Sequence, residues 1–126
     1  MKIILSTENA PSAIGPYSQG VVSSGEIVFI SGQTPINPET GMIESQNIIS
    51  QARQVLKNVG AILEAAGLGY ENVVKTTCFI TDMGYFAEFN TVYEEFFKEN
   101  CPARSCVAVK ELPKQSLCEI EVIAVR

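Results

Sequence analysis

The longest regular pattern of apolar and polar residues predicts an amphipathic helix over residues 46–66. Its apolar side chains recur at steps of three and four, which puts them on one face of a helix. Ser45 is the expected N-cap, and Gly67 is the residue expected just beyond the C-terminal end. The apolar face consists of Ile48, Ile49, Ala52, Val55, Leu56, Val59, Ile62, Leu63 and Ala66.

A second helical pattern covers about residues 83–99 and is rich in aromatic side chains. Asp82 is the candidate N-cap, because an aspartate oxygen accepts hydrogen bonds from the free N–H groups of a first helical turn. The apolar residues of this helix again fall on one face, which we expect to be buried. They are Phe86, Phe89, Val92, Tyr93, Phe96 and Phe97.

Shorter apolar and β-branched runs predict the strands of a sheet. Between the second and third runs, Ser23-Ser24-Gly25-Glu26 is typical of a turn that joins two strands into a hairpin. The prolines between Gly32 and Gly41 indicate a loop, and residues 9–20 form a second, ordered loop around Tyr17. The predicted strands are residues 2–5, 18–23, 26–31, 72–81, about 104–110 and about 117–125.

The order of these elements predicts one α+β domain over residues 1–126, with a sheet that carries its helices on one face. Successive side chains of a strand point to opposite faces, so we expect Arg104 and Cys106 to share one face of their strand. By the same rule, Glu119 and Glu121 lie together on one face of the last predicted strand. The sheet face without helices is too apolar for water, which favours homo-oligomerisation.

Charge and composition narrow the range of partners. The net charge of −5, with no basic run, makes nucleic acid an unlikely partner, since binding phosphates needs clustered Lys and Arg. No apolar run approaches the length of a membrane span, and the first residues do not resemble a signal peptide. We therefore expect a cytoplasmic protein that binds a small molecule or another protein.

The chain has four cysteines without a CxxC pair and no histidine, so we expect no metal site. A cytosolic setting favours free thiols. The missing histidine also removes the commonest general base and leaves carboxylates to move protons. Because Cys106 has no histidine to activate it, a thiol that lines a pocket is a better interpretation than a covalent catalyst.

Arg104 follows Pro102 and Ala103 at the entrance of a strand, where its side chain can be held rigidly. Its planar guanidinium matches a carboxylate and stays charged when water is removed. Structural pairing is common, so an ion pair with Glu119 or Glu121 is an open alternative, as is a plain surface arginine. The two glutamates are either a catalytic acid and base or solvated charges on an edge strand.

Two loop segments are further candidates for binding. Tyr17 lies between Gly15 and Gly20, which let the backbone approach a ligand closely. Its phenol either caps an apolar pocket or anchors the loop. Ser31-Gly32-Gln33, at the end of a strand, offers backbone N–H groups to an anion.

Taken together, these segments resemble the Rid family of reactive-intermediate deaminases, and in particular its RidA branch. The resemblance covers almost the whole chain, and it is specific because the motifs occur jointly and in order. The motifs are Thr7-Glu8-Asn9-Ala10-Pro11, Ile14-Gly15-Pro16-Tyr17-Ser18-Gln19-Gly20, Ser31-Gly32-Gln33, Gln51-Ala52-Arg53-Gln54, Asn58-Val59, Glu64-Ala65-Ala66-Gly67, Val74-Lys75-Thr76-Thr77, Pro102-Ala103-Arg104-Ser105-Cys106 and Glu119-Ile120-Glu121-Val122-Ile123-Ala124.

The resemblance implies a chorismate-mutase-like α+β fold, assembled as a homotrimer with a site between neighbouring subunits. It implies hydrolysis of 2-imino acids, such as 2-iminobutanoate and 2-iminopropanoate, to 2-keto acids and ammonia without a metal or organic cofactor. Such imines arise when pyridoxal-phosphate enzymes dehydrate serine or threonine, which implies a functional link to those enzymes. The alternative is a ligand-binding regulatory protein of the same fold, acting in purine or translation regulation without catalysis.

The resemblance also assigns roles to residues. Arg104 is similar to the arginine that grips the substrate carboxylate, and Glu119 to the acid that positions or activates the water. One departure is Cys101, which stands where an aromatic residue often precedes the proline, and this change puts the substrate range in doubt. The residues that fall where the family lines its pocket are Tyr17, Ser31, Gly32, Asn90 and Cys106.

Overall fold

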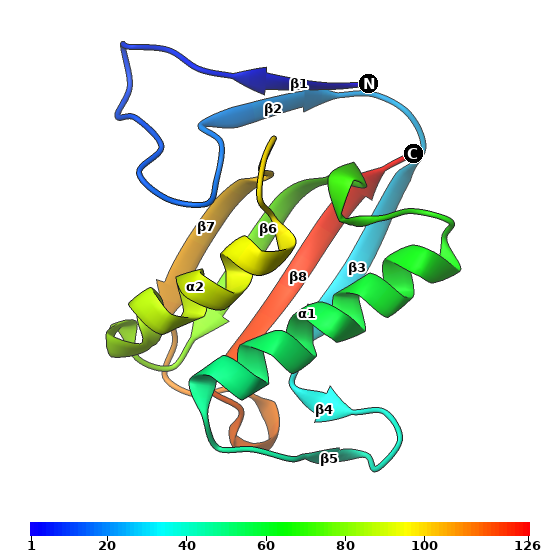
Figure 1. The fold of residues 1–126 in the computed structure, drawn as a ribbon, viewed down its shortest axis with the longest axis vertical. Helices are drawn as coiled ribbons and strands as arrows, with labels where there is room; N and C mark the ends of the chain where they lie inside the picture. Colours follow the sequence, from blue (N-terminus) through cyan, green and yellow to red (C-terminus); the bar gives the residue numbers. More distant parts are fainter.

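A four-stranded mixed sheet forms the centre of the computed structural model, which describes residues 1–126 (Figure 1). The strands, in their order across the sheet, are β3 (Ile27–Gln33), β8 (Cys118–Val125), β6 (Val73–Ile80) and β7 (Ala103–Ala108). β8 runs antiparallel to both of its neighbours, whereas β6 and β7 are parallel. The strand that comes last in the sequence therefore has a central place in the sheet.

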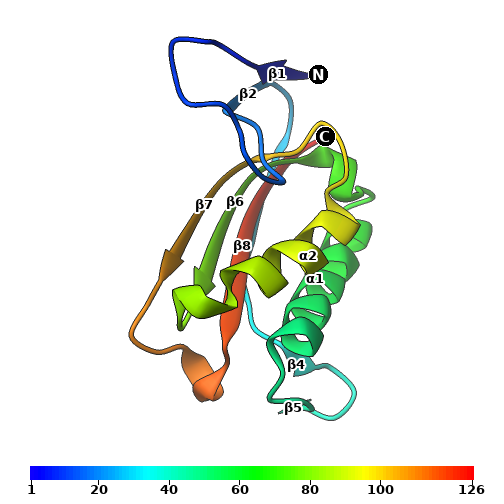
Figure 2. The same cartoon turned by 60° about the vertical axis from the view of Figure 1, so that its left-hand side comes forward.

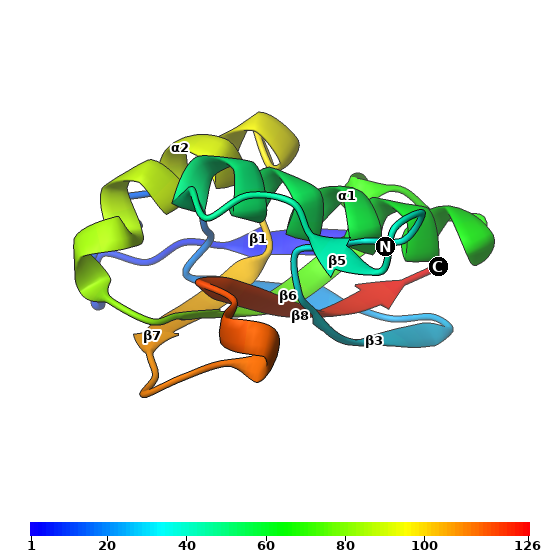
Figure 3. The same cartoon turned by 90° about the horizontal axis from the view of Figure 1, so that it is seen from below.

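Two helices, α1 (Ile48–Ala65) and α2 (Phe86–Phe96), lie on the same face of this sheet (Figures 1 and 3). Their apolar stripes pack on side chains of β3, β6 and β8 and form the hydrophobic core. This arrangement confirms the predicted α+β class and the position of both helices on one face of a mixed sheet. Neither helix combines the length and the apolar character that crossing a membrane requires.

The N-cap of α1 is Asn47, so the prediction of Ser45 was wrong. The Asn47 side-chain oxygen accepts hydrogen bonds from the N–H groups of Ile49, at 2.8 Å, and Ser50, at 3.2 Å. The Ser45 hydroxyl accepts only from the N–H of Asn47, which precedes the helix. At the other end, Gly67 has a φ of +74°, the left-handed conformation predicted for the residue beyond the helix.

Asp82 caps a short 3₁₀ turn, Met83–Tyr85, that leads into α2, and not the α-helix itself as predicted. Its carboxylate accepts a hydrogen bond from the N–H of Gly84 at 2.7 Å. α2 ends at Phe96 rather than at residue 99, because Phe97 leaves the helical conformation and buries its ring. The first turn of the predicted helix is therefore a 3₁₀ turn, and the last residues of the predicted helix, 97–99, are not helical.

The predicted hairpin across Ser23-Ser24-Gly25-Glu26 was wrong, because β2 (Gly20–Ser23) pairs with β1 (Lys2–Leu5) and not with β3. The turn is present, and Gly25 has a φ of +136°. A Cβ atom at Gly25 would lie 2.6 Å from the carbonyl oxygen of Arg126, so the turn packs against the end of β8. After this turn the chain enters β3, which pairs with β8 and contributes to the core under the helices.

The predicted loop from Gly32 to Gly41 contains one strand of an additional short pair, β4 (Ile36–Asn37) and β5 (Met42–Ile43). The Asn58 side chain of α1 donates to two carbonyl groups of this region, which ties the pair to the helix. Strands of two residues are too short for the alternation of side chains to reveal them. The remaining 3₁₀ turns are Tyr70–Asn72 and Pro113–Gln115.

No helix or strand covers the second face of the central sheet (Figures 2 and 3). Large apolar side chains are exposed there: Phe29 at 73%, Ile27 at 54% and Val107 at 46%. Exposed apolar side chains of this size on an uncovered sheet face are typical of an association surface. The alternation of side chains also puts Glu119 on this face, since its neighbours Cys118 and Ile120 are buried under the helices.

Replacing Asn47 with alanine is expected to lower the free energy of unfolding by about 1 kcal/mol, the usual cost of losing an N-cap side chain. Urea unfolding at a fixed protein concentration measures the change. Ser45→Ala is the matched control and should cost clearly less, because it removes a bond outside the helix. An equal or larger loss in Ser45→Ala would contradict the assignment of the cap.

Candidate functional site

The Arg104 side chain points from the edge strand β7 toward α2. In the register of the parallel pair β6–β7, Arg104 lies opposite Thr76, which is fully buried under the helices. Directly paired residues of neighbouring strands point to the same face. Arg104 therefore lies on the helix side of the sheet, at its open edge, where it is half-buried.

Aromatic rings and one amide surround the Arg104 guanidinium. Its Nη1 atom donates a hydrogen bond of 2.7 Å to the side-chain oxygen of Asn90. Its central carbon lies 4.8 Å from the ring centre of Tyr93, 5.5 Å from that of Phe86 and 5.7 Å from that of Tyr17. A cation within about 6 Å of a ring face is attracted by the ring quadrupole. Three rings thus hold the charge in a defined position.

Backbone contacts bring the Tyr17 loop to the entrance of β7. The N–H of Ser18 donates to the carbonyl of Pro102 at 3.1 Å, and Ser18 forms a parallel bridge with Ala103. The hydroxyl of Tyr17 accepts a hydrogen bond from a backbone N–H within the same loop. Tyr17 therefore anchors its own loop, as one of the two alternatives from the sequence predicts, and its ring also contacts Arg104.

Arg104 has no carboxylate partner in the chain. The salt bridges are Arg53–Glu95 and Arg126–Glu26, so the alternative of an ion pair with one of the two β8 glutamates was wrong. Its single side-chain hydrogen bond uses Nη1 and leaves the other guanidinium donors free. A half-buried, unpaired guanidinium with free donors can bind an external anion, and its planar fork matches the geometry of a carboxylate.

Glu119 and Gly32 form a second cluster, on the uncovered face of the sheet. A Cβ atom at Gly32 would lie only 2.1 Å from a carboxylate oxygen of Glu119, so this carboxylate occupies the space that a side chain would fill. The pairing of β3 with β8 shifts its register between Ile30 and Gln33, which turns the backbone at Gly32 toward β8. Ser31 is exposed beside this irregularity.

These two clusters lie on opposite faces of one sheet, as the alternation of side chains predicts. Arg104 and Cys106 share the helix side, whereas Glu119 and Glu121 share the other side. β7 and β8 are separated by β6, and the register offsets Arg104 from Glu119 by roughly 10 Å along the strands. A single chain therefore holds two half-sites that cannot act on one small molecule.

Cys106 lies two residues beyond Arg104 and directly opposite Cys78 on β6. Burial raises the pKa of the Cys106 thiol, and the weaker attraction of Arg104 for a thiolate does not reverse this. Burial likewise raises the pKa values of Cys78 and Cys118 to about 12. All four cysteines are free, and no three Cys, Asp or Glu side chains come together in a way that could hold a metal ion.

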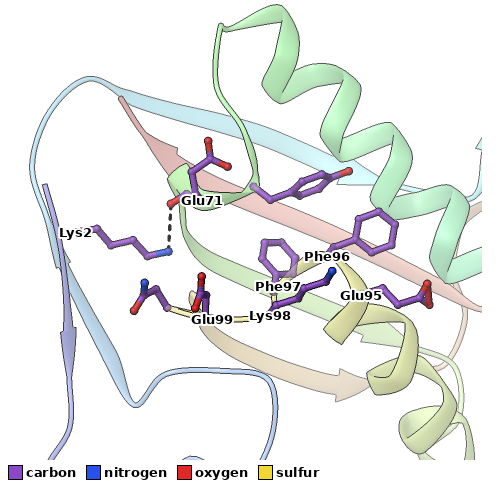
Figure 4. Close-up of a pocket in the computed structure, with 9 residues that line it drawn as sticks. Lys2, Glu71, Glu95, Phe96, Phe97, Lys98 and Glu99 are labelled. Carbon is purple, nitrogen blue, oxygen red and sulfur yellow. Dashed lines mark hydrogen bonds between the residues drawn. The ribbon is translucent and has the colours of Figure 1, made fainter.

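A separate hollow lies between the end of α2, the 3₁₀ turn before β6, and β1 (Figure 4). Within it the Lys2 ammonium donates to the carbonyl oxygen of Glu71 at 3.4 Å, and burial lowers the pKa of Lys2. Its glutamates outnumber its lysines, and no predicted site residue lines it, so it does not suit a carboxylate ligand. The hollow is lined by Lys2, Tyr70, Glu71, Glu95, Phe96, Phe97, Lys98, Glu99 and Asn100.

Two residues that contact Arg104, Phe86 and Tyr93, were assigned from the sequence only to the apolar stripe of their helix. The available signal was Asn90, a polar residue at the helical spacing of four and three from these two aromatic residues. A polar side chain on an apolar face needs a partner, and here the partner is Arg104. The face of α2 toward β7 thus holds Arg104 as well as forming part of the core.

Comparison with known proteins gives relatives over the full length. The chain is 53% identical to the 2-iminobutanoate/2-iminopropanoate deaminase of Escherichia coli (strain K12), over 100% of this chain and 99% of that protein. It is equally similar, at 53% identity and the same coverage, to the enzyme of that name from Salmonella typhimurium. It is 52% identical to a RutC family protein of Pyrococcus horikoshii, over 98% of each chain.

Solved structures agree with this picture. E. coli TdcF with bound serine matches with a TM-score of 0.76 at 51% identity, over 98% of each chain. A putative endoribonuclease from Thermotoga maritima matches with a TM-score of 0.78 at 49% identity, over 100% of this chain and 98% of the other. The model of the family described as Endoribonuclease L-PSP matches residues 7–126. The chain therefore belongs to the Endoribonuclease L-PSP family, which confirms its resemblance to the Rid proteins.

Proposed function

We propose that this protein is an enzyme that hydrolyses reactive 2-imino acids, such as 2-iminobutanoate and 2-iminopropanoate, to 2-keto acids and ammonia. The observation that carries this proposal is Arg104, a half-buried guanidinium that has free donors and no carboxylate partner. The full-length relatives named for this activity support it. The net charge of −5 speaks against RNA as the substrate, despite the family's description.

Arg104 binds the substrate carboxylate. Its guanidinium forks onto the two carboxylate oxygens, while Asn90 and the surrounding rings keep its plane fixed. This contact holds the imine carbon next to the carboxylate in one orientation, which lowers the entropic part of the barrier. Tyr17, Asn90 and Cys106 form the wall of this half-site.

Glu119 handles the proton of the attacking water, together with the backbone at Ser31 and Gly32. It accepts a proton as the water oxygen bonds to the imine carbon, which gives a tetrahedral amino-alcohol. Glu119 then gives this proton to the amino nitrogen and takes the proton of the new hydroxyl group, so that the C=O bond forms as the carbon–nitrogen bond breaks and ammonia leaves the 2-keto acid. A protonated imine is already electrophilic, so carboxylate assistance suffices for this reaction.

We further propose that the protein is a homotrimer in which Glu119 of one subunit faces Arg104 of the next. The two half-sites lie on opposite faces of the sheet, so they can meet only across an interface between different surfaces. Such head-to-tail interfaces close into rings. The exposed Phe29, Ile27 and Val107 supply apolar area for this contact.

In this proposal the substrate comes from cytoplasmic pyridoxal-phosphate enzymes that dehydrate serine or threonine. Their products are short 2-imino acids with small apolar side chains. Release of such imines into water exposes other enzymes to a reactive electrophile. Rapid hydrolysis at the site between subunits removes it.

Arg104→Ala is expected to lower kcat/KM for keto-acid release by about a hundredfold or more, because two charge-assisted hydrogen bonds are lost. The imine is generated in situ by a threonine dehydratase, and release of 2-oxobutanoate is followed. Arg53→Ala is the matched control, since Arg53 is an exposed arginine that pairs with Glu95. If wild-type protein does not accelerate release, or Arg104→Ala equals it, the proposed activity is wrong and a binding protein is the better interpretation.

Mixing two inactive variants tests the shared site. In Arg104→Ala trimers every site lacks Arg104, and in Glu119→Gln trimers every site lacks the carboxylate of Glu119. After the two are unfolded and refolded together in equal amounts, about a quarter of the interfaces should combine an intact Arg104 with an intact Glu119. Activity should return to about that fraction of wild type. No recovery in mixed trimers, checked by mass spectrometry, would mean that both residues act within one chain.

Cys106→Ala should keep kcat/KM within about fivefold of wild type, whereas loss of a covalent nucleophile typically costs about a thousandfold or more. The raised pKa values keep the thiols protonated near neutral pH, so iodoacetamide should react slowly with folded protein. The rate at Cys106 should increase as the pH rises above 9. Rapid alkylation of Cys106 at pH 7 with loss of activity would contradict its role as a pocket wall.

A further inference from the structure

We propose that Tyr93 is the positioning residue for the substrate-binding arginine, with its buried ring as the fixed surface on which the Arg104 guanidinium rests. This inference builds on the proposed role of Arg104 in binding the carboxylate. Tyr93 does not reach the substrate itself, because it is fully buried beneath the arginine. Its effect on the reaction is therefore transmitted through Arg104.

The ring of Tyr93 is the nearest of the three that contact the guanidinium, at 4.8 Å, and the only one that is fully buried. Phe86 and Tyr17 are both partly exposed. A cation–ring contact gains most where water is excluded, from about 0.5–1 kcal/mol at exposed sites to about 2 kcal/mol when desolvated. The Tyr93 contact is thus the strongest of the three.

The Tyr93 ring is itself attached to β6, the strand next to the one that carries Arg104. Its hydroxyl forms a hydrogen bond of 2.8 Å with the hydroxyl of Thr76, and both residues have no exposed surface. Thr76 is the residue of β6 that lies directly opposite Arg104 on β7. The phenol is therefore tied to the backbone position next to the one that carries the arginine.

Neighbouring rings from α2 and from the residue just after it leave Tyr93 little freedom to move. Phe97 lies 4.6 Å from it between ring centres, and Phe89 lies 6.2 Å away in a stacked orientation. Burial raises the pKa of the Tyr93 phenol, so the hydroxyl stays neutral, and the attraction for Arg104 comes from the ring face. A neutral, immobile ring fixes the plane of the cation without competing for its hydrogen-bond donors.

Asn90 and Tyr93 restrain Arg104 in complementary ways. The bond from Nη1 to Asn90 fixes the rotation of the guanidinium within its plane. The contact with the Tyr93 ring limits how far that plane can tilt. The edge that remains free then has a defined direction, which a two-pronged contact with a carboxylate requires.

The first experiment compares Tyr93→Leu, Tyr93→Phe and the control Leu63→Ala, a fully buried residue of α1 that makes no contact with Arg104. We expect Tyr93→Leu to weaken the binding of 2-oxobutanoate, measured by calorimetry, by about 3- to 30-fold. KM should rise by a similar factor with little change in kcat. Tyr93→Phe keeps the ring and loses only the bond to Thr76, so its affinity should fall by no more than about two- to fivefold. Leu63→Ala should lower Tm with unchanged affinity.

A purely structural role for Tyr93 predicts the opposite pattern, in which Tyr93→Leu lowers Tm and leaves both KM and 2-oxobutanoate affinity at wild-type values. That result overturns the inference. If Tyr93→Leu does not fold, Thr76→Val decides, since it frees the phenol from β6 while keeping the ring. We then expect an affinity loss of about two- to fivefold, from one lost hydrogen bond, and an unchanged affinity overturns the inference.

A ligand-free measurement separates this inference from the proposed activity. A guanidinium over a ring face has its Nε–H NMR signal shifted by the ring current, and Arg104→Lys identifies that signal by its loss. The shift should persist in Tyr93→Phe and become clearly smaller in Tyr93→Leu, where only the more distant rings of Phe86 and Tyr17 remain. If the wild type neither hydrolyses imines nor binds 2-oxobutanoate but shows this pattern, the proposed function fails and the positioning role stands. If the shift in Tyr93→Leu equals that of the wild type, the positioning role fails whatever the activity.

Discussion

The alternation of side chains between the two faces of the central sheet is the constraint on which the rest of this molecule depends. It sends the apolar residues of β6 and β8 under the helices and leaves Glu119 with exposed apolar side chains on the other face. It also gives Arg104 to the helix side, where α2 can hold it. The fold therefore separates the cation from the acid, and chemistry that needs both requires more than one chain.

Much of the fold was predictable because side chains repeat every two residues along a strand and every 3.6 residues along a helix. The long stripe of α1, the strand limits of β6 and the facing of Arg104 and Glu119 all follow from local patterns. The N-cap was misplaced because Ser45 and Asn47 are both good capping residues, and only the backbone decides between them. The pairing of β3 with β8, far apart in the sequence, is absent from any local pattern.

The arginine half-site was harder to predict from the sequence, because its residues also come from segments that are far apart in the chain. Its rings come from a loop near Tyr17 and from the α2 residues Phe86 and Tyr93, which an apolar stripe alone assigns to the core. Arg104 was a candidate from its chemistry and its place at a strand entrance, and resemblance to a family added Asn90, but neither pointed to the buried ring beneath them. The bulge that turns Gly32 toward Glu119 likewise depends on a register shift between distant strands.

The central place of β8 has a consequence for the synthesis of this protein. Residues 118–125 lie between β3 and β6, so neither strand has its main partner until that segment has left the ribosome. Until then β7 and β6 can pair, but β3 has no neighbour in the sheet and its apolar side chains stay in water. Contacts between such distant segments form slowly. Before β8 is available, the nascent chain exposes the apolar side chains of β3, and this exposure makes that stage prone to aggregation.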